Sequence, residues 1–187
     1  MKTNVHRLLD AAGIAYTTAA YEADASDLSG LHAAGMLGMP PEQVFKTLVL
    51  RDAVLPVPGG FLVCCIPAAD ELDLRKTARA SGKKKVALIP VRDMLHVTGY
   101  IRGGCSPIGM KKQFPTYIDE TAELFGVISI SAGARGRLVL LNPRDLLRHV
   151  SGVFADLTEE IRGGCPRSFL VRSLSIGSCL KDEDFLK

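Results

Sequence analysis

The chain has 187 residues, of which 47% are hydrophobic and 23% are charged, and its formal net charge is +3. This length suits one domain with a core plus a tail, and the balance of residue types excludes disordered and fibrous classes. No apolar run approaches the roughly 18 to 20 residues of a membrane span, and residues 1–10 lack the apolar centre of a signal peptide, so we expect a cytoplasmic protein with no membrane partner.

Cysteine and histidine usage gives no support for a disulfide framework or a metal centre. The five cysteines include the adjacent Cys64 and Cys65 and no C-x-x-C spacing, so we expect reduced thiols. The histidines lack any H-x-x-x-H pairing. They are scattered as His6, His32, His96 and His149. We therefore expect no metal and no cofactor.

Hydrophobic spacing and turn residues predict the elements of the first half of the chain. They are helix 4–12, strand 15–20, helix 27–37, strand 44–50 and strand 60–67. In the last strand Cys64 and Cys65 lie within an apolar run, which predicts core residues rather than nucleophiles. Lys46 interrupts the apolar strand 44–50, and its side chain must point either to solvent by alternation or into a cavity.

A dense group of basic residues follows. Asp73 is a good N-cap for a helix over 74–80, which Gly82 ends. The basic residues of this helix and of the run after it are Arg75, Lys76, Arg79, Lys83, Lys84 and Lys85. They indicate either a solvated face or a surface that contacts a phosphate backbone.

The glycine-rich stretch 99–112 comes after a strand over 86–89 and a helix over 90–96. Gly103 and Gly104 are adjacent, allow positive φ and let another molecule approach bare backbone, whose N–H groups can donate to a ligand oxygen. Pro107 stiffens the far side. The stretch indicates either a loop that cradles a carbonyl or phosphate oxygen or an ordinary tight turn.

The remaining pattern alternates short strands and helices. We expect strand 115–119, helix 120–125, strand 127–130, a small-residue loop 131–136, strand 138–141 and helix 144–150. The irregular alternation favours an α/β (α+β) fold in which short helices surround a mixed, partly closed, barrel-like sheet. We divide the chain into a domain over 1–157 and a C-terminal tail over 158–187.

Several blocks of sequence together resemble the YbaK family, the free-standing Cys-tRNA(Pro) deacylases related to the editing domain of bacterial prolyl-tRNA synthetases. The blocks are Tyr21-Glu22-x-Asp24, Val44-Phe45-Lys46-Thr47-Leu48, Leu72-Asp73-Leu74-Arg75-Lys76, Gly99-Tyr100 with Gly103-Gly104-Cys105-Ser106-Pro107-Ile108-Gly109, Pro115-Thr116-x-Ile118-Asp119, and Ser131-x-Gly133-x-Arg135-Gly136. The resemblance runs from about residue 4 to about 157. The chain departs from the family where Leu28 or Leu31 replaces an aromatic residue and where Leu138 replaces an acidic one.

The resemblance implies a hydrolase that removes cysteine wrongly attached to proline tRNA. Lys46 and the backbone of Gly103 and Gly104 would act at the terminal adenosine. The implied substrate-binding residues are Tyr21, Thr47, Ser106, Pro107, Ser131 and Arg135, and the implied partners are mischarged tRNA(Pro) and prolyl-tRNA synthetase, with no DNA. The sequence has no evident Ser-His-Asp or Cys-His arrangement, which fits the family's use of the substrate thiol as nucleophile.

Three alternatives remain at this stage. The chain could instead deacylate Ala-tRNA(Pro), since the leucine substitutions alter the pocket. It could be a noncatalytic tRNA-binding module that keeps the fold and the basic residues. Finally, Cys105 follows two glycines and could be a catalytic thiol, although no particular histidine is tied to it; its other role is a small apolar filler of the pocket wall.

Overall fold

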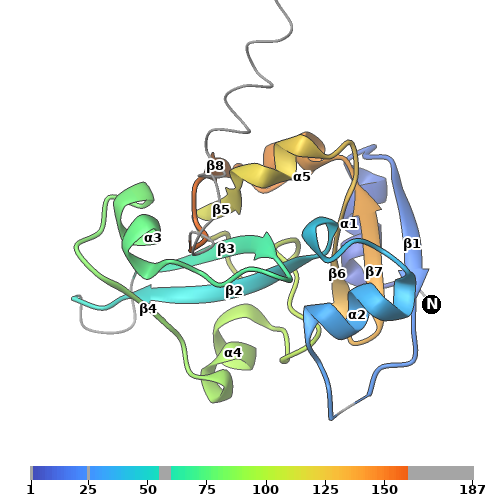
Figure 1. The fold of residues 1–187 in the computed structure, drawn as a ribbon, viewed down its shortest axis with the longest axis horizontal. Coiled ribbons are helices and arrows are strands. Elements are labelled where there is room, and N and C mark those ends of the chain that lie inside the picture. Colours follow the sequence, from blue (N-terminus) through green and yellow to red (C-terminus); the bar gives the residue numbers. More distant parts are fainter. Residues whose placement is uncertain (1, 25, 55–59, 160–187) are drawn as a thin grey trace, which may run out of the picture.

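Two β-sheets form the framework of the protein in a computed structural model that describes residues 2–24, 26–54 and 60–159 (Figure 1). The smaller sheet is antiparallel, with the order β1-β7-β6. Its strands are β1 (Tyr16–Ala20), β6 (Ile128–Ala134) and β7 (Arg137–Leu141). The larger sheet is mixed, with the order β4-β2-β3-β5-β8. Its strands are β2 (Phe45–Asp52), β3 (Phe61–Pro67), β4 (Val86–Leu88), β5 (Thr116–Asp119) and β8 (Val153–Ala155).

Five α-helices and two short 3-10 helices surround these sheets in the described part of the chain. They are α1 (Asn4–Ala11), α2 (Gly30–Leu37), η1 (Pro41–Gln43), α3 (Leu74–Ala80), α4 (Val91–Thr98), η2 (Glu120–Leu124) and α5 (Pro143–His149). Side-chain caps fix several of the starts, because an unpaired N–H at a helix start needs an acceptor. Ser29, Asp73 and Asn142 supply those acceptors for α2, α3 and α5.

Strand β2 joins the two sheets and leaves part of one edge open. One edge of β2 pairs with β3 along Phe45–Arg51. On the other edge β4 pairs only with Leu50–Asp52. An isolated parallel bridge between Val44 and Ser129 brings the start of β2 beside β6. Between these two contacts, the edge of β2 faces a space bounded by both sheets.

The two faces of β2 and β3 are covered by different helices. On one face Leu50, Leu62, Cys64 and Ile66 pack with Ala78 of α3. On the other face Val49 packs with Ile89 and Cys105, and Met94 and Val97 of α4 lie against them. This division follows from the pleat, since successive side chains of a strand point to opposite faces. In Figure 1, α3 and α4 accordingly lie on opposite sides of β2.

The predicted mixed α/β fold is confirmed. The strands form two separate sheets that meet at the bridge between Val44 and Ser129, and they do not close into one barrel. Cys64 and Cys65 are fully buried, as expected. The small-residue segment 131–136 is not a loop: its first four residues continue β6 through a β-bulge, and the turn contains only Arg135 and Gly136. A bulge tolerates small residues and glycine inside a strand, which misled the prediction from composition.

Two other differences concern boundaries. Helix α2 begins at Gly30 rather than near residue 27, because Asp27 accepts a hydrogen bond from the Ser29 N–H and Ser29 becomes the cap. Strand β8 was not predicted, since three residues, Val153–Ala155, give too short a pattern. Parallel pairing with β5 holds this strand in the sheet.

The end of the described chain is fastened to the domain by Asp119. Its carboxylate accepts hydrogen bonds from the Thr121 N–H, the Thr121 hydroxyl and the Leu157 N–H, at 3.1, 2.6 and 3.1 Å. Thr158 then forms an isolated antiparallel β-bridge with Leu72, and the Glu159 N–H donates a hydrogen bond to the Glu71 carbonyl. Residues 160–187 lie outside the described residues, so the proposed tail over 158–187 stays a prediction. No helix in the described part of the chain is long and apolar enough to cross a bilayer.

Candidate functional site

A cleft of about 600 Å³ opens along the free edge of β2. Its walls come from the start of α2, the strands β2, β6 and β7, the helix α4 and the glycine-rich stretch 99–112. Five of the residues predicted for the site line it: Tyr21, Lys46, Thr47, Gly103 and Ser131. These residues are far apart in sequence, and the joining of the two sheets brings them together.

Lys46 enters the cleft as a partly buried cation whose side chain is 25% exposed. Its Nζ donates to the Ala68 carbonyl at 3.3 Å and lies 3.6 Å from the carboxylate of Glu71. Glu71 is itself 81% exposed, so water screens this ion pair and it contributes little to stability. Lys46 is therefore held loosely and can exchange these contacts for a ligand.

Three of the hydroxyl groups that line the cleft with Lys46 were predicted for the site. Thr47 is adjacent on β2, Ser131 lies on β6, and Tyr21 lies just after β1. Burial raises the pKa of the Tyr21 hydroxyl, which keeps it protonated and able to donate a hydrogen bond at neutral pH. The Ser131 hydroxyl accepts from the Gly133 N–H within the bulge, so the bulge fixes its position.

The open edge of β2 adds backbone groups that motif reading missed. Ile89 N–H donates to the Val49 carbonyl, so the peptide groups of Val49 face away from β3. Because alternate residues of a strand direct their peptide groups to the same side, those of Thr47 do so too. They face the cleft at the stretch where β4 no longer pairs with β2.

Gly103 and Gly104 have different surroundings. Gly103 lines the cleft with φ +83°, and a Cβ there would meet the side chain of Leu28 at 3.0 to 3.2 Å. A Cβ on Gly104 would meet the backbone of Ala134 and Arg135, and its N–H donates to the Ile101 carbonyl at 3.0 Å. In this structure the protein's own hairpin is therefore the close neighbour of Gly104, and its N–H is already engaged.

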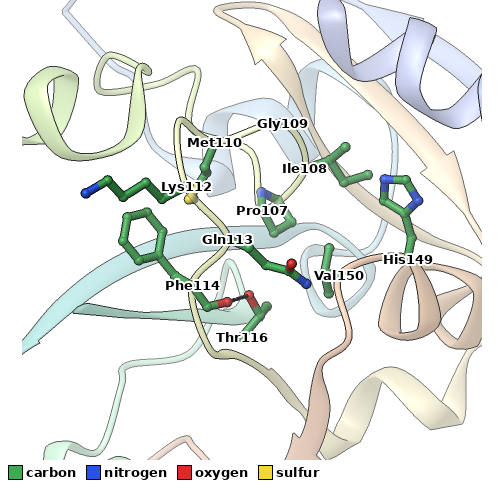
Figure 2. A pocket seen from close by; sticks show the side chains of 10 residues that line it. All are labelled: Pro107, Ile108, Gly109, Met110, Lys112, Gln113, Phe114, Thr116, His149 and Val150. Atoms are coloured by element: carbon green, nitrogen blue, oxygen red, sulfur yellow. Dashed lines mark hydrogen bonds between the residues drawn. The ribbon is translucent and has the colours of Figure 1, made fainter. Parts of the chain in front are cut away.

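Ser106 and Pro107 lie outside the cleft. Ser106 is fully buried, and its hydroxyl accepts from the Ile108 N–H. Pro107 lines a separate cavity of about 190 Å³ with His149 and Phe114. Figure 2 shows this cavity, with His149 on one side and the ammonium of Lys112 extending away on the other. Ser106 and Pro107 therefore support the conformation of the glycine-rich stretch on the side away from the cleft.

Arg135 also acts on this stretch and does not line the cleft. Its Nε donates to the Arg102 carbonyl at 3.0 Å, which ties the β6–β7 turn to the residue before Gly103. Tyr100 braces the same stretch, because its hydroxyl donates to the Ile108 carbonyl at 2.6 Å. The contacts of Arg135 are those of a positioning residue.

Cys105 forms part of the cleft wall and is only 8% exposed. Burial raises the pKa of its thiol to about 12, so it is protonated at neutral pH and a poor nucleophile. We expect Cys105→Ala to retain catalytic activity within about twofold and to lose about 1 kcal/mol of unfolding free energy from the vacated volume. Activity per folded molecule and urea unfolding measure the two effects, with Cys64→Ala, a fully buried cysteine outside the cleft, as control. A large fall in kcat with an intact fold would make Cys105 catalytic.

Gly136 fixes the backbone beneath Tyr21. Its φ is +67°, its carbonyl accepts from the Tyr21 N–H, and a Cβ would collide with the Tyr21 carbonyl. Gly136→Ala should therefore lower the unfolding free energy by about 2 kcal/mol or more, from the unfavourable φ and the clash. Gly35→Ala on α2 is the matched control: it meets no atom within 4 Å and should stabilise slightly. Equal denaturation midpoints for the two variants would contradict this account.

The titratable groups of the cleft are few. Among the described residues that line it there is no histidine, and Glu71 is the single carboxylate. No group of three or more His, Cys, Asp or Glu side chains suited to a metal ion occurs in the described residues. The cleft thus combines the partly buried Lys46, two exposed arginines, Arg102 and Arg137, several hydroxyl groups and open backbone groups. Such an arrangement is suited to orienting a polar ligand. Glu71 was missed by sequence reading, since only its position in space connects it with the site, whereas Leu28 and Leu31, named there as departures from the family, both line the cleft.

The basic residues of α3 and the following run do not line the cleft. Lys76 Nζ bonds Asp156 at 2.9 Å and the Thr158 carbonyl at 2.8 Å, and Lys83 Nζ lies 3.3 Å from Asp52. These two lysines serve packing within the domain. The others, Arg75, Arg79, Lys84 and Lys85, are exposed. The predicted tRNA contact of this surface stays a prediction.

Fold and cleft together define a mixed α/β domain with a polar cleft where its two sheets meet, and comparison with known proteins gives the class. A model of the aminoacyl-tRNA editing domain matches residues 25–149. An Enterococcus faecalis protein named "Putative Cys-tRNA(Pro)/Cys-tRNA(Cys) deacylase EbsC" is 43% identical over 157 residues, which cover 84% of this chain and 93% of that protein. The chain belongs to the aminoacyl-tRNA editing domain family, and its class, aminoacyl-tRNA hydrolase, is confirmed.

Solved structures share the fold. The crystal structure of the hypothetical protein APE2540 has a TM-score of 0.75 at 23% identity, covering 84% of this chain and all of that one. A "putative trans-editing enzyme for prolyl tRNA synthetase" has a TM-score of 0.70 at 23% identity, covering 86% of this chain and all of that one. At these identities the likeness concerns the fold alone.

Proposed function

We propose that this protein is a trans-editing deacylase that hydrolyses the ester of mischarged Cys-tRNA(Pro), with the substrate thiol as nucleophile. The observation that carries the proposal is the chemistry of the cleft. It offers a cation, hydroxyls and backbone groups that can orient an ester, and its one thiol, Cys105, is buried and protonated. The name of the 43% identical relative supports the same substrate.

The terminal adenosine would occupy the cleft beside the free edge of β2. Peptide groups of Thr47 and the backbone of Gly103 would hydrogen-bond the aminoacyl ester, beside Leu28, which lies next to Gly103. Lys46 would leave Glu71 and contact the ribose or phosphate side, as a positioned point charge. Binding of this kind would accelerate the intramolecular attack, because it holds the thiol and the ester carbonyl in the geometry that the reaction needs.

The chemical step needs no protein nucleophile. The sulfur of the cysteinyl group attacks its own carbonyl carbon, so a C–S bond forms and the C–O bond to the ribose breaks. The ribose oxygen leaves with the proton that the thiol gives up, which releases free tRNA. Water then opens the cyclic thioester and yields cysteine. Oxygen charge that develops during the attack would be stabilised by the hydrogen-bond donors of the cleft.

A panel of charged tRNAs tests the proposal. The purified protein should deacylate Cys-tRNA(Pro) with multiple turnovers and leave Pro-tRNA(Pro) intact. Preference for Ala-tRNA(Pro) would assign the other editing specificity, and binding without turnover would make the chain a noncatalytic module. Adding prolyl-tRNA synthetase to the same reactions tests whether that enzyme is a partner, which should appear as faster clearance of Cys-tRNA(Pro).

A further inference from the structure

A second and larger groove, of about 1220 Å³, lies on the other side of α4 from the cleft. Helix α4 separates the two: Val91 and Met94 line the cleft, whereas Arg92 and His96 line the groove. Ile89, just before the helix, lines both. A flexible chain that leaves the cleft past the start of α4 would therefore enter this groove directly.

The groove is basic. Its side chains include five cations, Arg51, Lys83, Arg92, Lys111 and Lys112, and one carboxylate, Asp93. They come from β2, the turn before β4, α4 and the glycine-rich stretch, so no sequence run reveals the concentration of charge. The predicted basic surface at α3 shares only Lys83 with it. The part of that surface on α3 lies on the opposite face of β2 from the groove, because α3 and α4 pack on opposite faces.

Most of these cations are available to a ligand. Arg51 and Lys112 form no ion pair with any of the described residues. Arg92 is 86% exposed and lies 3.9 Å from Asp93, a weak surface pair. Lys111 donates to the His96 carbonyl at the end of α4 and remains exposed, whereas Lys83 is held by Asp52. In Figure 2 the Lys112 ammonium points away from the small cavity behind it.

Aromatic side chains lie among the cations. Phe61 of β3 and Phe114 line the groove and contact each other edge to face, with ring centroids 6.0 Å apart. Both rings are partly exposed. Aromatic faces beside a cationic track are the combination that binds single-stranded nucleic acid, because the bases stack on the rings while the cations follow the phosphates.

We propose that this groove binds the single-stranded acceptor end of the tRNA, with Arg51, Arg92 and Lys112 on its phosphates, and that the α3 surface does not take part. The proposal rests on the proposed function, since the cleft would hold the terminal adenosine of the same strand. Charge complementarity and the shared boundary at Ile89 select this occupant. The contacts to phosphate are independent of base sequence, so amino-acid specificity stays with the cleft.

Two variants that remove equal charge from opposite faces test the groove. Arg92→Gln/Lys112→Gln changes two exposed groove residues, and Arg75→Gln/Arg79→Gln changes two exposed residues of α3. Binding of a labelled single-stranded RNA ending in CCA to the full chain is measured by fluorescence anisotropy over a range of salt concentrations. Circular dichroism confirms that both variants fold.

The groove variant should bind about tenfold more weakly, and the slope of log Kd against log salt should fall by about 1.4, since each single-strand phosphate contact contributes roughly 0.7. The α3 variant should keep the wild-type affinity and slope. An unchanged slope for the groove variant, or an equal loss in the α3 variant, overturns the proposal.

Kinetic measurements distinguish a failure of the groove proposal from a failure of the proposed deacylase function. With full-length Cys-tRNA(Pro) the groove variant should raise KM, whereas cleavage of the cysteinyl ester of adenosine, which is too short to reach the groove, should not change. An equal loss with both substrates would mean that the groove affects the cleft and would overturn the proposal. If the wild-type protein cleaves neither substrate, the proposed function fails, while the binding comparison still decides whether the groove holds RNA.

Discussion

Replacing Lys46 with alanine should lower kcat/KM for Cys-tRNA(Pro) about 100-fold or more and leave the protein folded. The expected size is that of losing one charged or strongly polar contact to the reacting group in a site sheltered from water. The fold should survive because the cation makes one 3.3 Å bond to the Ala68 carbonyl and a screened contact to Glu71. Single-turnover deacylation and thermal unfolding are measured on the same preparations.

Two further variants test whether the effect of Lys46→Ala comes from the loss of the charge at this position. Lys46→Met keeps most of the apolar stem and removes the charge, so it should be as inactive as Lys46→Ala and at least as stable. Lys2→Ala removes an exposed lysine that pairs with Asp10 outside the cleft and should keep wild-type kinetics. A collapse of stability in Lys46→Met, with full activity in the molecules that remain folded, would make Lys46 structural and remove it from the site.

The identity of the amino acid should change the chemical rate about as strongly as the loss of Lys46 changes kcat/KM. If the substrate thiol attacks, a seryl ester should be cleaved at least about 100-fold more slowly, because a hydroxyl is a poor nucleophile near neutral pH unless a base activates it. The described cleft residues include no histidine to act as such a base. An alanyl ester, which has no side-chain nucleophile, should be slower still.

Single-turnover rates at saturating protein separate this chemical effect from binding. The three esters are carried on the same tRNA(Pro), so contacts outside the amino acid are equal. Comparable rates for cysteinyl, seryl and alanyl esters would rule out thiol attack and point to an activated water. Glu71, the carboxylate beside Lys46, would then be the candidate base. In that case Glu71→Gln should abolish the reaction, whereas under thiol attack it should retain most of it.

Sequence by itself determined the local features of this protein. The apolar runs predicted β2 and β3 and the burial of Cys64 and Cys65, because a short continuous apolar run is itself the pattern of a buried strand. Cap and stop residues placed α3, where the side chain of Asp73 accepts from the first N–H groups. The ordered blocks of the YbaK resemblance identified the family before any contact was known.

Tertiary structure alone decided which of those residues meet. Tyr21, Lys46 and Ser131 share the cleft because the bridge between Val44 and Ser129 joins two sheets, and no local pattern encodes a contact over such a separation. The same packing puts the backbone of Ala134 and Arg135 against Gly104 and places Pro107 in a separate cavity. The basic groove beside α4 likewise collects cations from four segments, whereas helix α3, which carries Arg75 and Arg79, packs on the opposite face of β2.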